Sequence, residues 1–181
     1  SSAAWAILAL GHPALAERLA REQERVCELV EKRKAIISRD RSAALITIVD
    51  SVLVVDSLSR AASAAGVELG VFLDVNSGMN RTGIAPGSDA VRLYRAICAR
   101  TGLRAAGLHV YDGHIHEPNA DARARQCDEE FRPVQAMIGE LCALGLPVPA
   151  VGAGGTPTFP THARRKGVEL SPGTPLLWDH G

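Results

Sequence analysis

Aromatic side chains, long apolar runs and an excess of either charge are scarce or absent in this chain. Aromatic residues make up 4% of its 181 residues, so the core must be aliphatic. No run of about 18 apolar residues occurs, and we expect no membrane-spanning helix. The formal net charge is +0, which does not indicate a nucleic-acid partner. The apolar start of the chain has no Lys or Arg before it, unlike a secretory signal peptide.

Cysteine usage is typical of a reducing compartment. The cysteines are far apart in the sequence and form no CxxC pair, the spacing of many zinc ligands and redox pairs. We therefore expect part-buried thiols of a cytoplasmic protein rather than disulfides or zinc ligands. These residues are Cys27, Cys98, Cys127 and Cys142.

Short apolar runs alternate with longer amphipathic stretches from about residue 45 onward. The apolar runs predict strands at residues 45–49, 67–75, 103–110, 148–151, 168–170 and 176–178. Helical spacing predicts one helix capped by Asp50 or Ser51 and ended by Gly66, and a second over residues 88–100. A third is capped by Asn119, and Pro133 should kink or divide it. This alternation is typical of parallel βαβ units and an α/β fold.

The first 44 residues have a different pattern. A charged amphipathic helix is expected over about residues 13–34, and no strand signal precedes residue 45. We therefore predict a helical segment at residues 1–44 and an α/β domain at residues 45–181.

The loop after the second predicted strand places Arg81 between two glycines, in NSGMNRTG at residues 76–83. Loops that follow parallel strands are where such sheets keep their chemistry. Glycine lets the backbone approach a ligand, and arginine offers fixed donors to a ring nitrogen, a phosphate or a carboxylate. On spacing alone, a solvated arginine in a surface loop is the simpler interpretation.

The next segment, GLHVYDGHIHE at residues 107–117, crowds three histidines, a tyrosine and two carboxylates at a strand end. His114 and His116 alternate and could share a face to bind a metal, although no third ligand is evident. Any of the three histidines, His109, His114 or His116, could act as a general base. Tyr111 could hydrogen-bond a cofactor. The alternative is a polar strand end with one buried histidine.

Two further loops are rich in glycine and proline. VGAGGTPT, at residues 151–158, offers backbone N–H groups and threonine hydroxyls that suit a phosphate. It matches neither the nucleotide P-loop nor GxGxxG. ELSPGTP, at residues 169–175, predicts a turn between two strands that could also close over a ligand.

Taken in order, four segments resemble the D-threonine aldolase and D-serine dehydratase group of fold-type III pyridoxal-phosphate enzymes, relatives of alanine racemase. The segments are LDVNSGMNRTGI, GLHVYDGHIH, VGAGGTPTFPTHA and GVELSPGTPLLWDHG, and the resemblance covers about residues 49–181. It implies a (β/α)8 barrel of the TIM type, the N-terminal-domain fold of alanine racemase. A usual complete barrel takes about 250 residues, so we expect a partial barrel whose open edges are covered or paired.

The resemblance also implies roles for particular residues. Arg81 would lie near the cofactor ring, Tyr111 would line its pocket, and Gly154, Gly155 and Thr156 would hold the phosphate. His109, His114 and His116 are candidates for the substrate pocket. The implied reaction is cleavage of a D-3-hydroxy amino acid to glycine and an aldehyde, or dehydration of D-serine. A homodimer is implied, as is a divalent metal such as Mn or Zn on ligands outside this chain.

One family feature is missing. The Schiff-base lysine of the family lies in a segment resembling RPHxKTH, and this sequence has none. Lys32 and Lys34 belong to a charged helical pattern, and Lys166 lies in HARRKGVEL. The sequence thus supports a lyase, represented by its cofactor-binding part, and, as an alternative, a non-catalytic pyridoxal-phosphate-binding remnant or association module. An amino-acid racemase fits the motifs less well.

Overall fold

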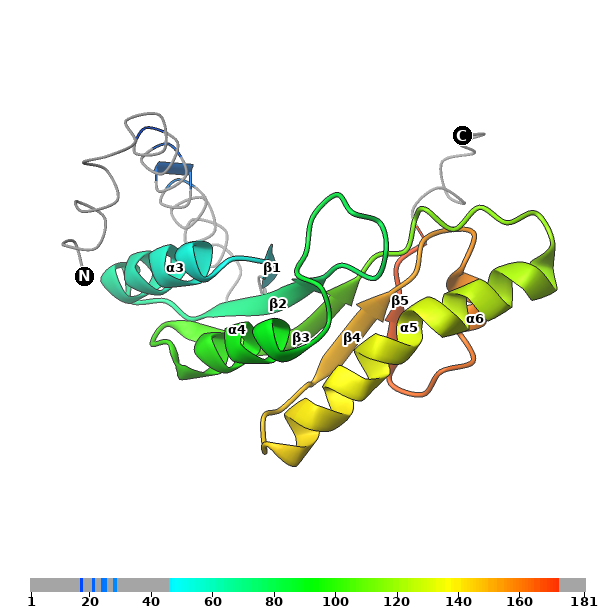
Figure 1. Ribbon diagram of the computed structural model, residues 1–181. Coiled ribbons are helices and arrows are strands. Elements are labelled where there is room, and N and C mark those ends of the chain that lie inside the picture. Colours follow the sequence, from blue (N-terminus) through cyan, green and yellow to red (C-terminus); the bar gives the residue numbers. More distant parts are fainter. Residues whose placement is uncertain (1–16, 18–20, 22–23, 26–27, 29–45, 173–181) are drawn as a thin grey trace.

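Five parallel strands form one sheet in the computed structural model, which describes residues 17, 21, 24, 25, 28 and 46–172. The strands follow one another across the sheet in sequence order (Figure 1). They are β1 (Ile46–Val49), β2 (Leu69–Val75), β3 (Leu103–Val110), β4 (Ala150–Ala153) and β5 (Val168–Leu170). Each adjacent pair is parallel.

Helices connect these strands. They are α3 (Val52–Ala65), α4 (Ser88–Ala99), α5 (Ala120–Ala143) and the single turn α6 (Phe159–His162). Crossovers between parallel strands are right-handed almost without exception. A sequential strand order therefore places the helices on one face of the sheet, as in a barrel, whereas a doubly wound sheet reverses its order. The expected α/β architecture is confirmed, with the topology of part of a barrel.

Helix α3 begins and ends where its caps predict. The Ser51 hydroxyl accepts a hydrogen bond from the N–H of Leu53 at 3.3 Å, which satisfies one of the free donors of the first turn. Gly66 ends the helix in the left-handed region, with φ at 65°. Asp50, the other cap candidate, instead accepts a hydrogen bond from the N–H of Gly83 at 3.0 Å.

Helix α5 continues without interruption through Pro133, so this proline does not divide it. Proline removes one N–H, and the carbonyl of Glu129 is left without its helical donor. Both residues are exposed, so water can take that place. The opposite face of the helix buries Phe131, Val134 and Leu141 against the sheet.

The core between helices and sheet is mainly aliphatic, as the low aromatic content requires. Alternate residues of β2 are fully buried on the helix side. They are Leu69, Val71, Leu73 and Val75. Tyr94 of α4 lies among them, and its hydroxyl donates to the Pro147 carbonyl at 2.6 Å. The other residues of β2, including Asp74, point to the opposite face of the sheet.

The boundaries of two strands differ from the prediction for local reasons. β2 begins at Leu69 because the N–H of Val67 is used to cap α3, donating to the Ala62 carbonyl at 3.0 Å. β4 begins at Ala150 because Pro149 has no N–H to give to a ladder. The shift carries β4 to Ala153, next to the glycine loop.

Some expectations fall on other parts of the chain. The strand predicted at residues 176–178 and most of the predicted helix at residues 13–34 lie outside the described residues. Of that helix, the described residues are helical and exposed: Glu17, Arg21, Glu24, Arg25 and Glu28. Cys98, Cys127 and Cys142 are free thiols, but Cys142 is exposed rather than part-buried as expected. Cys27 lies outside the described residues. Within the described residues, no helix is both long and apolar enough to cross a membrane.

Candidate functional site

The loop after β2 is held in one shape by its own side chains. The amide oxygen of Asn76 accepts hydrogen bonds from the N–H groups of Gly78 and Asn80, each at 3.0 Å. The backbone of Asn76 also pairs with that of Ile84 at 2.9 Å, which closes the loop at its base. Gly83 has φ at 92°, and a Cβ there would lie 2.8 Å from the Asn76 nitrogen. This loop therefore presents Arg81 from a fixed backbone.

Asp74 and His109 form a pair on the sheet face that points away from the helices. Parallel pairing sets the two residues side by side in β2 and β3, and their side chains are 2.8 Å apart. Burial alone would raise the pKa of Asp74. Hydrogen bonds from His109 and Thr82 and the nearby charge of Arg81 outweigh burial and hold this pKa below its usual value. Asp74 is therefore ionised at neutral pH and orients His109.

Three of the predicted cofactor residues come together at the carboxyl edge of the sheet. The guanidinium of Arg81 lies over the Tyr111 ring, 5.2 Å from the ring centre. Gly155 approaches the same ring, because a Cβ at that position would lie 3.3 Å from Tyr111 Cε2. Arg81 is exposed, and Tyr111 and Thr156 are half-buried. Loops after β2, β3 and β4 thus form one polar surface around Tyr111.

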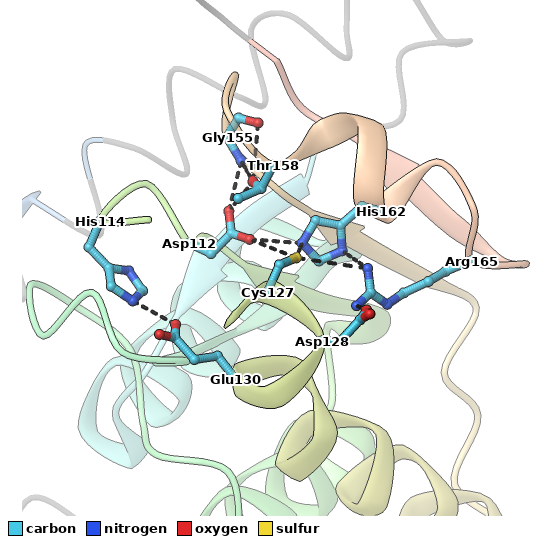
Figure 2. A network of polar contacts seen from close by, with 9 residues as sticks. All are labelled: Asp112, His114, Cys127, Asp128, Glu130, Gly155, Thr158, His162 and Arg165. Carbon is cyan, nitrogen blue, oxygen red and sulfur yellow. Dashed lines mark hydrogen bonds and ion pairs between the residues drawn. The ribbon is translucent and has the colours of Figure 1, made fainter. Parts of the chain in front are cut away.

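A buried polar network lies next to this surface and centres on Asp112 (Figure 2). One carboxylate oxygen accepts from the N–H of Gly155 at 2.9 Å and from the Thr158 hydroxyl at 2.6 Å. The other lies 2.8 Å from Nε2 of His162. Burial raises the pKa of Asp112, but the hydrogen bonds from His162, Thr158 and Gly155 outweigh it and hold this pKa below its usual value.

The network continues from His162 to helix α5. Nη1 of Arg165 lies 3.1 Å from Nδ1 of His162, and Arg165 also pairs with Asp128. The guanidinium also lies 4.5 Å from the centre of the Phe131 ring. Because arginine can only donate, Nδ1 of His162 is the acceptor and its Nε2 carries the proton given to Asp112. Arg165 thereby fixes the tautomer of His162.

Asp112, Cys127 and His162 are the one group in the described part of the chain with three potential metal ligands close together. Their ligand atoms lie within 4.8 Å of one another. The hydrogen bonds around them oppose a metal, because a cation on Nε2 of His162 would displace the proton fixed by Arg165. Burial and the charge of Asp112 also raise the pKa of Cys127 to about 11, so its thiol stays protonated. We interpret the group as a hydrogen-bonded network.

The three predicted histidines do not form one site. His109 pairs with Asp74, whereas His114 lies 2.6 Å from Glu130 of α5 and packs against Gly78. His116 is exposed. Within the described residues, neither His114 nor His116 belongs to a group of three potential metal ligands. The pairing of His114 with Glu130 instead ties the loop after β3 to α5.

Sequence reasoning missed most of the buried network. Asp112 and Cys127 were visible only as members of a polar segment and of a helix face. Thr158 was expected as a hydroxyl of a phosphate loop, whereas it donates to Asp112, and His162 had no assigned role. The available signal was the spacing of Thr158 and His162, since residues four apart lie on the same side of a helical turn. The N–H of His162 indeed donates to the Thr158 carbonyl at 3.2 Å.

A family profile described as the alanine racemase N-terminal domain matches residues 11–177. The chain belongs to the alanine racemase N-terminal-domain family. This confirms the resemblance of the four motifs to fold-type III pyridoxal-phosphate enzymes. The match also extends to residue 11, into the segment in which the motifs showed no likeness. The boundary between residues 44 and 45 remains a prediction.

The relatives of this chain include named enzymes. A 3-hydroxy-D-aspartate aldolase of Paracoccus denitrificans is 30% identical over 121 residues, which cover 66% of this chain and 31% of the relative. A D-threo-3-hydroxyaspartate dehydratase of Delftia is 30% identical over 152 residues, which cover 81% of this chain and 39% of the dehydratase. The crystal structure of D-threonine aldolase from Filomicrobium marinum matches with a TM-score of 0.72 and 32% identity. The match covers 80% of this chain and 40% of the aldolase chain. The chain thus spans about a third of the length of these two curated relatives, the aldolase and the dehydratase.

The residues of this family chain fit pyridoxal phosphate in part. Arg81, Tyr111 and the glycine loop supply a cation, an aromatic wall and a closely approaching backbone at one edge of the sheet. Lys166 is the single lysine in the described residues, and it lies before β5, near the amino ends of the strands. It lines a groove of about 440 Å³ against α5 rather than the surface around Tyr111. Arg81 and Tyr111 fit the cofactor, but the N–H groups of Gly154 and Gly155 and the Thr158 hydroxyl donate to acceptors of the protein rather than pointing to a phosphate. The described residues place no lysine beside this surface.

Proposed function

We propose that this chain is the cofactor-binding part of a pyridoxal-phosphate-dependent lyase that acts on D-3-hydroxy amino acids. Its reaction would be retro-aldol cleavage to glycine and an aldehyde, or dehydration of a substrate such as D-serine. The cofactor, when bound, supplies an electron sink for the bond broken at Cα. Arg81, Tyr111 and the loop at residues 154–156 would bind and orient it.

The convergence of Arg81, Tyr111 and Gly155 supports this proposal best. The three residues belong to loops that are more than 25 residues apart in the sequence, yet they meet at the carboxyl edge of the sheet. That edge is where barrel enzymes bind their ligands. A cation beside an aromatic ring and a close backbone suits a flat, anionic molecule better than a neutral one.

His109 is the described residue best placed to act on a substrate. Asp74 holds one ring nitrogen at 2.8 Å, which leaves the other nitrogen of His109 to exchange a proton. The side chain of His109 is 27% exposed, and the charge of Arg81 acts on its partner Asp74. We propose that it moves or holds a proton near the bound cofactor and D-amino acid.

The alternative is a non-catalytic cofactor-binding or association module. Its support is the position of Lys166 before β5, away from Tyr111. The homodimer, the cytoplasmic location and a divalent metal bound outside this chain, all expected from the resemblance, remain predictions.

The deciding experiment is to titrate the 181-residue chain with pyridoxal phosphate, followed by absorbance and by mass after borohydride reduction. We expect saturable binding that inorganic phosphate weakens. A reduced adduct fixed on Lys32, Lys34 or Lys166 would support a lyase, whereas reversible binding without an adduct would support the module. Absence of saturable binding would contradict both forms of the proposal.

Arg81→Ala tests the site itself. Losing a charge-assisted contact costs about 1.5–3 kcal/mol, so affinity for pyridoxal phosphate should fall by about tenfold or more. Arg132→Ala is the matched control, because Arg132 is an exposed arginine on α5, away from the Tyr111 surface. Equal affinity of the two variants would contradict the assignment of Arg81.

A further inference from the structure

The glycine loop turns its own N–H groups into the protein. Gly154 donates to the Val110 carbonyl at 3.2 Å, and Gly155 donates to Asp112 at 2.9 Å and to the Thr158 hydroxyl at 3.0 Å. The shape of the loop therefore depends on the acceptors behind it. Gly155 is buried with its Cα against the Tyr111 ring, and the half-buried Thr156 follows it at the edge of the site.

Asp112 is the main acceptor behind the loop. It takes hydrogen bonds from the Gly155 N–H, the Thr158 hydroxyl and His162, and its side chain is 5% exposed. The Cys127 thiol is a fourth donor, at 3.6 Å, and together the four fix the orientation of a carboxylate that has almost no access to water. Removing it would leave Nε2 of His162 without its carboxylate partner. The Gly155 N–H and the Thr158 hydroxyl would keep only their bonds within the loop, at 3.0 and 3.3 Å, so the loop would lose its tie to the end of β3.

We propose that Asp112 is a positioning residue that sets the ligand-facing shape of the loop at residues 154–158, and that His162 holds Asp112 in the required orientation. The inference rests on the proposed function, because this loop is the expected phosphate site. Neither side chain need touch the ligand. Both act through the backbone of Gly155.

His162 suits this role because both of its ring nitrogens are engaged. Nδ1 accepts from Arg165, and Nε2 donates to Asp112. Arg165 is held in turn by Asp128 and by the Phe131 ring, so the chain of contacts ends on helix α5. The rigid helix thereby fixes the glycine loop through the side chains of Arg165, His162 and Asp112. A loop fixed before the ligand arrives loses less entropy on binding, which raises affinity.

The tautomer of His162 allows a sharp substitution test. Glutamine also carries one donor and one acceptor at its end, so His162→Gln can donate to Asp112 and accept from Arg165. His162→Leu keeps much of the volume but offers neither. Asp112→Asn keeps an acceptor for Gly155 but turns an amide N–H towards the N–H of His162. The four proteins, wild type included, differ mainly in this network.

Two measurements on the full chain separate positioning from general stability. The first compares binding of pyridoxal phosphate with binding of pyridoxal, which lacks the phosphate. His162→Leu and Asp112→Asn should weaken the binding of pyridoxal phosphate by about tenfold and leave the binding of pyridoxal nearly unchanged. His162→Gln should bind pyridoxal phosphate almost as tightly as wild type. The second is amide hydrogen exchange of Gly155, with Leu108 of β3 as the reference for global stability. Exchange at Gly155 should accelerate more than at Leu108 in the two disruptive variants.

The outcomes distinguish this inference from the proposed function. If wild type binds pyridoxal phosphate but both disruptive variants bind it equally well, positioning is overturned while the proposed function stands. An equal loss for the two ligands, with no recovery in His162→Gln, would also overturn it in favour of general destabilisation. If wild type binds neither ligand, the proposed function fails. In that case, unchanged amide exchange of Gly155 in His162→Leu would overturn the inference as well. Faster exchange would still support the claim that His162 and Asp112 fix the loop.

Discussion

Asp112 and Asp74 are buried carboxylates that stay ionised because of the donors around them. Burial alone would raise both pKa values, yet hydrogen bonds from histidine and threonine side chains hold them below the ordinary value of 3.8. A carboxylate whose pKa is lower in the folded state binds fewer protons there than in the unfolded chain. Its contribution to stability is therefore present above the unfolded pKa and is lost as pH falls towards the folded one.

This linkage predicts that the free energy of unfolding of wild type falls as the pH is lowered from about 5 to 3. Asp112→Asn should be less stable at neutral pH and should show a smaller fall, because Asp112 no longer titrates. Glu129→Gln, an exposed carboxylate removed from the same chain, serves as the control. Urea unfolding at a series of pH values measures all three. An Asp112→Asn slope equal to that of wild type would show that Asp112 does not titrate below its unfolded value.

At this scale, sequence patterns identify residues with an obvious local setting. The position of Arg81 and Tyr111 in loops at strand ends was predictable, because each follows a strand and has glycine or polar neighbours. Partners such as Glu130 for His114, or His162 for Asp112, lie 16 and 50 residues away. No local pattern encodes these pairs, because the elements that carry them are brought together only by packing of α5 and α6 against the sheet.

Helix α5 carries a glycine whose conformation does not need glycine. Gly139 lies in the helix interior, is exposed, and a Cβ there would meet nothing within 4 Å. Gly139→Ala should stabilise the protein by about 0.5–1 kcal/mol, because alanine loses less backbone entropy in a helix. Denaturant unfolding measures the change.

Gly145, which follows the same helix, provides the matched control. Its φ is 69°, a conformation that costs about 1 kcal/mol for residues with a Cβ, so Gly145→Ala should destabilise. A Gly139→Ala variant less stable than wild type would show that α5 is strained or differently packed at this position.

Elements were predictable to the extent that their ends are chemically marked. Ser51 and Gly66 bound α3 as expected because capping and the left-handed conformation depend on single residues. The start of β4 was misplaced by two residues because Pro149 interrupts an apolar run without changing its hydrophobicity. Pro133 did not divide α5, since tertiary packing of residues on either side outweighs one missing hydrogen bond.

The sheet of the whole molecule has one face covered by helices and an opposite face with apolar residues near β1. Ile46 and Ile48 are 39% and 48% exposed, and the pairing of Ile48 with Phe72 places both on the face opposite to the helices. In a closed barrel this face points inward and is filled by side chains from the other strands. In the described residues five strands are present, so this face is open.

An open apolar face predicts concentration-dependent association of the 181-residue chain. Burying a side chain such as Ile48 contributes about 1.5–3 kcal/mol, so Ile48→Lys should weaken association by about tenfold or more. Leu144→Lys is the matched control, because Leu144 is 45% exposed but follows α5, on the helix side. Sedimentation velocity over a range of concentrations should show a flatter mass profile for Ile48→Lys and a wild-type profile for Leu144→Lys. A wild-type profile for both would mean that the face of β1 is not where chains meet, and the expected homodimer would then have to form elsewhere on the molecule.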